Sequence, residues 1–270
     1  MNLASLRLGI REQVPRPLTI GLGAIPVVVL LGLWWLLTAG EPEFRVISPV
    51  ILPSPGEVLV SFPSLWFDRA LARSIAMSFY RVLGGFFVAL LTALPLGIAM
   101  GSFSKVKAAF TPITVLTAYL PIPALVPLTM SLFGTGEGQK VAFLAIAFFA
   151  YLVPLTVAAV DAVDGVYLQS AAVLGANRWQ MVRSVLIPVA LPRIFHALRL
   201  GFGVGWGYII LAEMVAAERG LGNIIIVSQR RGPKEHIYLV LVVIVLIAFL
   251  TDKAWAAATR RLFPYEEERR

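Results

Sequence analysis

The chain has 270 residues, of which 59% are apolar and only 14% are charged, and it contains no cysteine. A soluble domain of this length is nearer half apolar and a quarter charged, so the composition excludes an ordinary soluble protein. The lack of cysteine excludes disulfides and thiolate metal sites. The net charge of +8 lies in short segments between apolar runs, a pattern that favours membrane-topology signals over nucleic-acid binding.

The apolar residues form runs of about 20 residues, the length that crosses a bilayer core. In chain order, we expect transmembrane spans at residues 19–39, 76–101, 108–133, 139–160, 190–216 and 237–258. A cleaved signal peptide is the alternative for the first run, but that run is too long and no small-residue cleavage pattern closes it. The sequence therefore predicts an all-α membrane protein with about six transmembrane helices.

Six spans place both chain ends on one side of the membrane. An N-terminal segment (1–18) and a tail (261–270) then flank a transmembrane domain that covers residues 19–260. Lysine and arginine are more frequent in the segments on the N-terminal side, which predicts that both ends are cytoplasmic. The mixed segment 40–74 is expected on the opposite side, with a short surface helix.

The third and fifth expected spans contain candidates for a translocation path or gate. Each proline of the third span removes a backbone donor, and irregular backbone is tolerated in a membrane only where protein or water covers it. A kinked but fully packed helix explains the same prolines equally well. In the fifth span, alternating glycines favour close helix packing more than a solute site. The candidate path residues are Tyr119, Pro121, Pro123, Pro127, Trp206 and Glu213.

Glu213 lies within the fifth apolar run or near its end. A carboxylate at the bilayer centre costs at least about 2.5 kcal/mol on insertion scales, so it requires a partner or water. Arg81 lies at a similar depth in the second span. We therefore expect an ion pair between these two residues, with a structural role favoured over a role in the path.

Residues 166–188 interrupt the apolar pattern between the fourth and fifth spans. Helix-forming residues lead to Gly175, which suits the left-handed position after a helix end. Asn177 then caps a second helix, with Gln180 three residues later as in a capping box. Pro188 is expected to end this helix. The small residues that would let another protein approach closely are Ala171, Ala172 and Gly175. By composition alone, an ordinary amphipathic connection fits as well.

The interrupting run resembles the cytoplasmic signature loop of ATP-binding-cassette importer permeases. That pattern is Glu-Ala-Ala, three residues, Gly, nine residues and Ile-x-Leu-Pro, and every spacing matches. The matching positions are Gln169, Ser170, Ala171, Gly175, Val185, Ile187 and Pro188. The residues themselves depart in part, since Gln169 replaces the glutamate and Ser170 replaces the first alanine. The fragments at 81–101 and 120–128 also resemble the nitrate, sulfonate and taurine branch of these permeases.

The resemblance implies a type I importer permease fold and a coupling helix that docks into a groove on a separate ATPase subunit. The coupling residues would be Gln169, Ser170, Ala171, Ala172, Gly175, Asn177, Arg178, Trp179 and Pro188. Because Gln169 removes a charge, a salt bridge from this position to the ATPase is not expected, although a hydrogen bond remains available.

The implied assembly lies in a bacterial inner membrane. It contains a second copy of the permease, most simply as a homodimer, two ATPase subunits that bind ATP and Mg, and an extracytoplasmic solute-binding protein. Its substrate would be a small anionic solute such as nitrate, a sulfonate, taurine or bicarbonate, moved by alternating access.

The chain itself is expected to have no catalytic or metal site, to bind no cofactor or nucleic acid, and to contact only these proteins and lipid. The segment GTGEGQKV at 134–141 departs from a phosphate-binding loop, because Gln139 precedes the lysine and Val141 follows it. The alternative function is an ion-gradient-driven secondary transporter. Such a protein should show several ionisable residues within its spans, or internal repeats.

Overall fold

The computed structural model describes residues 14–265, and every regular element in that range is a helix. The chain divides into two compact units, the first ending at Ser61 and the second beginning at Phe62. This boundary falls inside the expected transmembrane domain, in the long segment after the first span. Most of the expected N-terminal segment 1–18 and part of the tail 261–270 lie outside the described residues.

The first unit contains α1 (Arg16–Leu37) and α2 (Pro55–Val60). The most apolar stretch of α1 has none of its residues buried within the chain. A helix that is apolar on every face requires lipid or another protein around it. Beyond the helix, the indole of Trp34 donates a hydrogen bond of 2.9 Å to the carbonyl of Pro53, which ties the following loop to the end of α1.

The carboxylate of Glu57 holds this loop together. It accepts two hydrogen bonds from the Arg45 guanidinium, at 2.8 and 3.0 Å, and one from the Ser54 amide at 2.7 Å. The hydrogen bonds from Arg45 favour the charged carboxylate. They lower the pKa of Glu57 from 4.5 to about 2, against the opposing effect of partial burial.

We expect the Arg45–Glu57 contact to lose its stabilising effect only in strong acid. A carboxyl with a lowered folded-state pKa stabilises the fold above its unfolded pKa and loses this effect as the pH falls through the folded value. For Glu57 the loss should run from pH 4.5 down to about 2. Arg45→Gln should return the Glu57 pKa toward 4.5, measured by NMR titration of the labelled carboxyl. An unchanged Glu57 titration in Arg45→Gln would show that Arg45 is not the cause.

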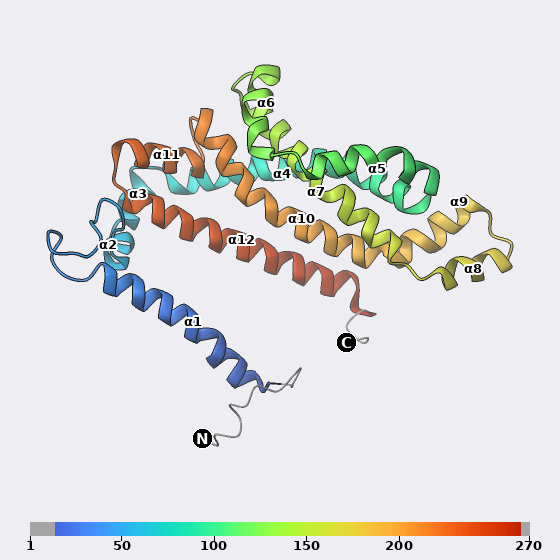
Figure 1. Ribbon diagram of the computed structural model, residues 1–270, viewed down its shortest axis with the longest axis horizontal. Helices are drawn as coiled ribbons and strands as arrows, with labels where there is room; N and C mark the ends of the chain where they lie inside the picture. The colour runs from blue at the N-terminus through green and yellow to red at the C-terminus, as the bar shows by residue number, and fades with distance from the viewer. Residues whose placement is uncertain (1–13, 266–270) are drawn as a thin grey trace. The chain divides into compact units, whose positions relative to one another are not determined.

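The second unit contains the remaining helices. They are α3 (Phe62–Phe67), α4 (Leu71–Ser102), α5 (Ser104–Ala118), η2 (Ile122–Ala124), α6 (Leu125–Phe133), α7 (Glu137–Asp161), α8 (Gly165–Val173), α9 (Arg178–Met181), η3 (Val182–Leu186), α10 (Ile187–Ala216), α11 (Leu221–Arg231) and α12 (Glu235–Leu262). The long helices α4, α7 and α10 run side by side, with α12 against α10 (Figure 1).

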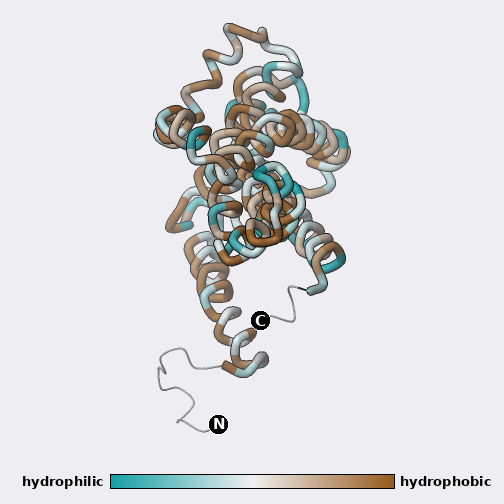
Figure 2. The backbone as a smooth tube through the Cα atoms, turned by 90° about the vertical axis from the view of Figure 1, so that its right-hand side faces the viewer, coloured by the Kyte–Doolittle hydropathy of each residue, from teal (hydrophilic) through white to brown (hydrophobic). Residues whose placement is uncertain are grey.

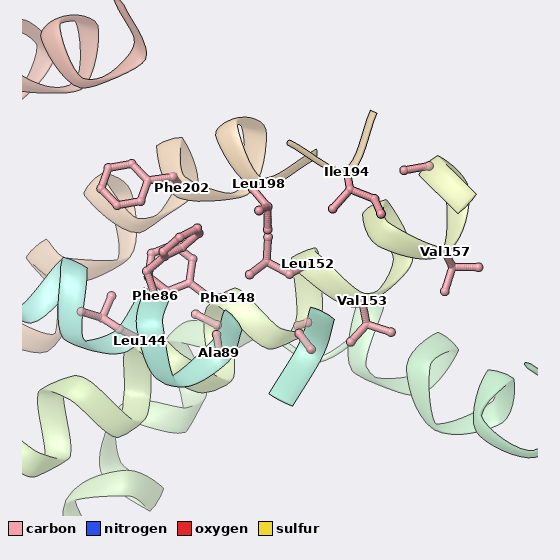
Figure 3. Close-up of a cluster of buried hydrophobic side chains, with 14 of the residues drawn as sticks. Phe86, Ala89, Leu144, Phe148, Leu152, Val153, Val157, Ile194, Leu198 and Phe202 are labelled. Carbon is pink, nitrogen blue, oxygen red and sulfur yellow. The ribbon is translucent and has the colours of Figure 1, made fainter. Parts of the chain in front are cut away.

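Aromatic packing joins α4, α7 and α10 at the centre of the second unit. Phe86 of α4 stands edge-on to Phe148 of α7 and to Phe202 of α10, with ring centroids 5.3 and 5.1 Å apart. Figure 3 shows these rings together with the aliphatic side chains around them. Edge-to-face rings stabilise a core beyond the area that they bury, so this cluster holds together three segments that are distant in the sequence.

Glycines allow these helices to approach closely. A Cβ on Gly85 of α4 would lie 2.4 Å from a side-chain carbon of α7. On α10, a Cβ on Gly201 or Gly205 would likewise collide with side chains of α7, whereas Gly203 and Gly207 face open space. Two of the four alternating glycines therefore serve helix packing within the chain, as small residues do at membrane helix interfaces.

The third expected span is broken rather than continuous. α5 and the segment from η2 to α6 meet at an angle of 83°, and α6 projects from the bundle beside the start of α7 (Figure 1). Pro121 precedes η2, and Pro123 and Pro127 lie in the first turns of η2 and α6. The first amides of a helix have no partner within it, so prolines are tolerated there, whereas a continuous helix through all three would lose several hydrogen bonds.

The broken element still passes from one end of the bundle to the other. Lys107, near the start of α5, forms an ion pair with Asp161 at the end of α7. Thr129 of α6 instead accepts a hydrogen bond of 2.9 Å from Gln139 at the start of α7. Within residues 14–265, five single helices are long and apolar enough to cross a membrane, and the bent pair makes six, in agreement with the expected number.

The outer surface of the long helices is strongly apolar. Hydrophobic residues, drawn in brown, cover most of the helices, and hydrophilic residues occur in short stretches (Figure 2). On α12, Val245 and Leu250 are 68% and 55% exposed. Exposed apolar area of this extent fits a helix that is surrounded by hydrocarbon rather than by water.

Candidate functional site

The segment between α7 and α10 contains a sharp turn after α8. Gly175 has a φ of +78°, in the left-handed region that favours glycine. The amide of Ala176 donates to the carbonyl of Ala171, and the amide of Gly175 donates to that of Ala172, both at 3.0 Å. These two bonds form a Schellman motif, the helix ending that the glycine predicts.

The second helix begins as expected but does not end where expected. Asn177 and Gln180 form a capping box with bonds of 2.8 and 2.9 Å. The prediction that Pro188 ends this helix is wrong, because α9 continues through η3 into α10. η3 is π-helical, and the amide of Ile187 donates to the carbonyl of Val182, five residues earlier. The wider turn accommodates the proline, which has no amide to donate.

The turn carries an exposed apolar tip. Val173, Leu174 and Trp179 are 88%, 87% and 65% exposed. Gln169, Ser170, Ala172, Gly175 and Arg178 are exposed as well. Ala171 differs from these neighbours, because it is only 7% exposed. Sequence reasoning did not single out Val173 and Leu174, although their apolar side chains beside a turn glycine were a usable signal.

At the opposite end of the bundle, the structure brings Arg81 and Glu213 together. Arg81 Nη1 lies 2.7 Å from Glu213 Oε1, and the two side chains are 1% and 0% exposed. Glu213 also accepts hydrogen bonds from the Ser78 hydroxyl at 2.7 and 2.9 Å and from the Gly222 amide at 2.9 Å. The buried carboxylate is therefore both paired and hydrogen-bonded, which is the condition for keeping a charge in such a place.

Arg81 has two further partners. Its Nε and Nη2 donate to the Glu137 carboxylate at 2.6 and 2.7 Å, and its Nη1 donates to the Arg219 carbonyl at 2.7 Å. This ion network, buried except at the half-exposed Glu137, connects α4, α7, α10 and the turn before α11. Glu137 was missed by sequence reasoning, although a lone carboxylate in the first turn of an apolar span was a signal. The turn requires Gly220, at φ +127°, because a Cβ there would lie 2.4 Å from Glu213 Cδ.

A cavity of about 390 Å³ lies beside the break in the third span. Its lining includes Thr117 of α5, Leu120 just beyond that helix, Tyr151 of α7 and Tyr208 of α10. The two tyrosine hydroxyls are 3.1 Å apart. Sequence reasoning missed both tyrosines because each lies inside an ordinary apolar run.

The predicted path residues divide between exposed and buried positions. Tyr119, Pro121, Pro123 and Pro127 are exposed around the break. Trp206 is only 2% exposed and packs against Phe79 of α4, with ring centroids 5.8 Å apart. It therefore does not line the cavity in this conformation, and Glu213 is enclosed in the ion network described above.

Residues 93–261, more than half of the chain, match the family described as binding-protein-dependent transport system inner membrane component. The chain belongs to this family. It is 36% identical to the taurine transport system permease protein TauC of Escherichia coli (strain K12), over 99% of this chain and 97% of the relative. It is 27% identical to the nitrate import permease protein NrtB of Synechocystis sp., over 91% of this chain and 90% of the relative.

The fold of this permease also matches solved structures. An inward-facing form of the MetNI methionine ABC transporter superposes with a TM-score of 0.66 at 21% identity, over 74% of this chain and 97% of that chain. The family and the type I permease fold expected from the sequence are thus confirmed. The permease is a multi-pass membrane subunit of an ABC importer, a class that works with ATPase subunits and a solute-binding protein.

Proposed function

We propose that this permease imports a small anionic solute of the taurine, sulfonate, nitrate or bicarbonate class, driven by ATP hydrolysis on partner subunits. Relatives that cover nearly its whole length carry names of taurine and nitrate import permeases, which supports this class of solute. The assembly would lie in the bacterial inner membrane, with the α8–α9 turn and both chain ends in the cytoplasm, as the distribution of lysine and arginine predicts.

The ATPase subunit docks on the apolar tip at Val173, Leu174 and Trp179. Large apolar side chains that are mostly exposed at a rigid turn are suited to insertion into a pocket on a partner. The surrounding polar residues of the loop, including Gln169 and Arg178, form the rim of this contact. ATP and Mg are bound by the ATPase subunits, and the permease transmits their movement through the helix that begins at the tip.

One continuous helical element joins the tip to the buried ion network. The helix from Arg178 to Val215 spans 38 residues, which corresponds to about 57 Å. Trp179 lies at one end and Glu213 at the other. A displacement of the tip by the ATPase therefore acts directly on the network that connects α4, α7 and α10, and this is our mechanism for alternating access.

The solute passes at the break of the third span, between two copies of the permease. Support comes from the cavity, in which the hydroxyls of Tyr151 and Tyr208 lie beside an interrupted helix. Hydroxyl donors can bind an anion without a compensating buried charge. A second copy would cover the exposed apolar residues Leu128, Leu132 and Phe133 of α6, so a homodimer encloses the path.

Uptake by vesicles that contain the permease, its ATPase and its binding protein tests this proposal. We expect taurine or nitrate uptake that requires ATP. Tyr208→Phe should raise the solute concentration for half-maximal uptake about tenfold, since a hydrogen bond to a charged group contributes about 1.5 kcal/mol or more. The matched control is Tyr80→Phe, an exposed tyrosine of α4 outside the cavity. Uptake that continues without ATP and follows a proton or sodium gradient would instead indicate a secondary transporter.

A further inference from the structure

A second cleft opens at the end of the bundle nearest the α8–α9 turn. It has a volume of about 620 Å³ and lies between α7, α10 and α12. Its walls contain Ala162 at the end of α7, Arg193 near the start of α10 and Arg260 near the end of α12. α7 and α12 end beside this cleft, whereas α10 continues past it through η3 into α9. Neither the ATPase contact nor the solute path proposed above uses these residues.

The rim of the cleft is cationic. Arg193 donates a hydrogen bond to the Ala162 carbonyl, which fixes its guanidinium at the rim. Arg260 is exposed and has no carboxylate partner among residues 14–265. Arg199 lies deeper, where its Nε and Nη2 bind both oxygens of Asp252 at 2.6 Å, so its charge is balanced. Two arginine charges therefore remain available at the rim.

The depth of the cleft is mainly apolar, apart from the charge-balanced pair of Arg199 and Asp252. Leu155 and Ala158 of α7 and Leu200 of α10 line the part that lies farther from the end of α7, and Leu155 also lines the cavity at the break of the third span. Seven residues of helix separate Arg193 from Leu200, which corresponds to about 10 Å. The lining thus changes from cationic to apolar over the distance that separates lipid headgroups from the upper part of their acyl chains.

We propose that this cleft binds an anionic phospholipid of the inner leaflet, with its phosphate between Arg193 and Arg260 and an acyl chain against Leu155, Ala158 and Leu200. Basic pockets between membrane helices on the cytoplasmic side are suited to anionic headgroups. The inference rests on the proposed function in one respect, namely that this end of the bundle faces the cytoplasm. A soluble anion would not account for the apolar depth of the cleft.

Native mass spectrometry of the purified full-length permease tests the site with phosphatidylglycerol and phosphatidylcholine as probes. We expect the unaltered protein to retain phosphatidylglycerol preferentially. Each arginine near an anionic headgroup contributes a factor of about five, so Arg193→Gln with Arg260→Gln should weaken this binding roughly 25-fold. Ala158→Phe, which fills the apolar depth at an exposed position, should also weaken it while both charges remain.

The matched control is Arg230→Gln with Arg231→Gln, two exposed arginines in the last turn of α11 that do not line the cleft. This variant should bind phosphatidylglycerol as the unaltered protein does. If the Arg193 and Arg260 double variant fails to fold, Arg260→Gln by itself should weaken binding about fivefold. Unchanged binding in a folded double or single variant would overturn the proposal.

Glycerophosphoglycerol, the headgroup without acyl chains, distinguishes a lipid from a soluble anion. It should compete poorly with phosphatidylglycerol, and competition at equal concentration would overturn the assignment to lipid. This measurement needs neither ATPase nor transported solute. Lipid binding can therefore succeed where ATP-driven uptake fails, and the two proposals are tested independently.

Discussion

Glu213→Gln should destabilise the permease by about 3–5 kcal/mol, the usual cost of removing one partner from a buried ion pair. The carboxylate accepts bonds from Ser78, Arg81 and Gly222, and all of these donors are enclosed with it. The N–H groups of the glutamine amide would face these donors, which then lack an acceptor. The guanidinium of Arg81 would also lose the negative charge that balances it inside the protein. Denaturant unfolding of the purified permease in detergent measures this change.

Glu137→Gln is the matched control, because it removes a carboxylate from the same arginine at a half-exposed position. The Glu137 side chain is 48% exposed, so we expect a loss of about 1 kcal/mol or less. Arg81→Met combined with Glu213→Gln should cost less than the sum of the single changes, by about 2 kcal/mol, since neither charge remains buried without its partner. Additive effects would show that Arg81 and Glu213 do not stabilise each other.

Leu174→Asp should prevent the permease from co-purifying with its ATPase. Leu174 is 87% exposed beside a turn that two backbone hydrogen bonds hold rigid, so the change leaves the permease folded. Loss of a central apolar anchor costs about 2 kcal/mol or more at an interface, and burial of an aspartate adds a desolvation penalty. Affinity should therefore fall at least 30-fold, measured with the purified subunits.

Val166→Asp provides the matched control for this docking surface. Val166 is 59% exposed on the same helix, but at its first turn, away from the apolar tip. Aspartate is tolerated at a helix N-terminus, so α8 should remain folded. ATPase binding should be unchanged, because Val166 lies outside the proposed contact. Equal loss of binding in both variants would place the ATPase contact along the whole of α8. Normal binding of Leu174→Asp would remove the tip from the interface.

Local sequence was sufficient to predict several features of this permease. The apolar runs predicted the membrane class and about six crossings, because the length and apolarity of a span are properties of the segment itself. Gly175, Asn177 and Gln180 predicted a helix ending and a new start within three residues, since caps depend on neighbours a few positions away. The prolines of the third span predicted an irregular backbone there for the same reason, but they did not distinguish a kink from a break.

Only the tertiary structure decided which distant residues meet. The matched depth of Arg81 and Glu213 predicted their ion pair, which the structure contains. That Glu137 of a third helix joins them could not be predicted, because the sequence holds no record of which faces the helices turn toward one another. The same is true of the tyrosine pair in the cavity and of the burial of Ala171 and Trp206. Pro188 was misjudged because continuation through a π-helical turn depends on the packing of Val182 and Leu186 in the core. Contacts within a few residues follow from local chemistry, whereas contacts between helices follow from the packing of whole faces.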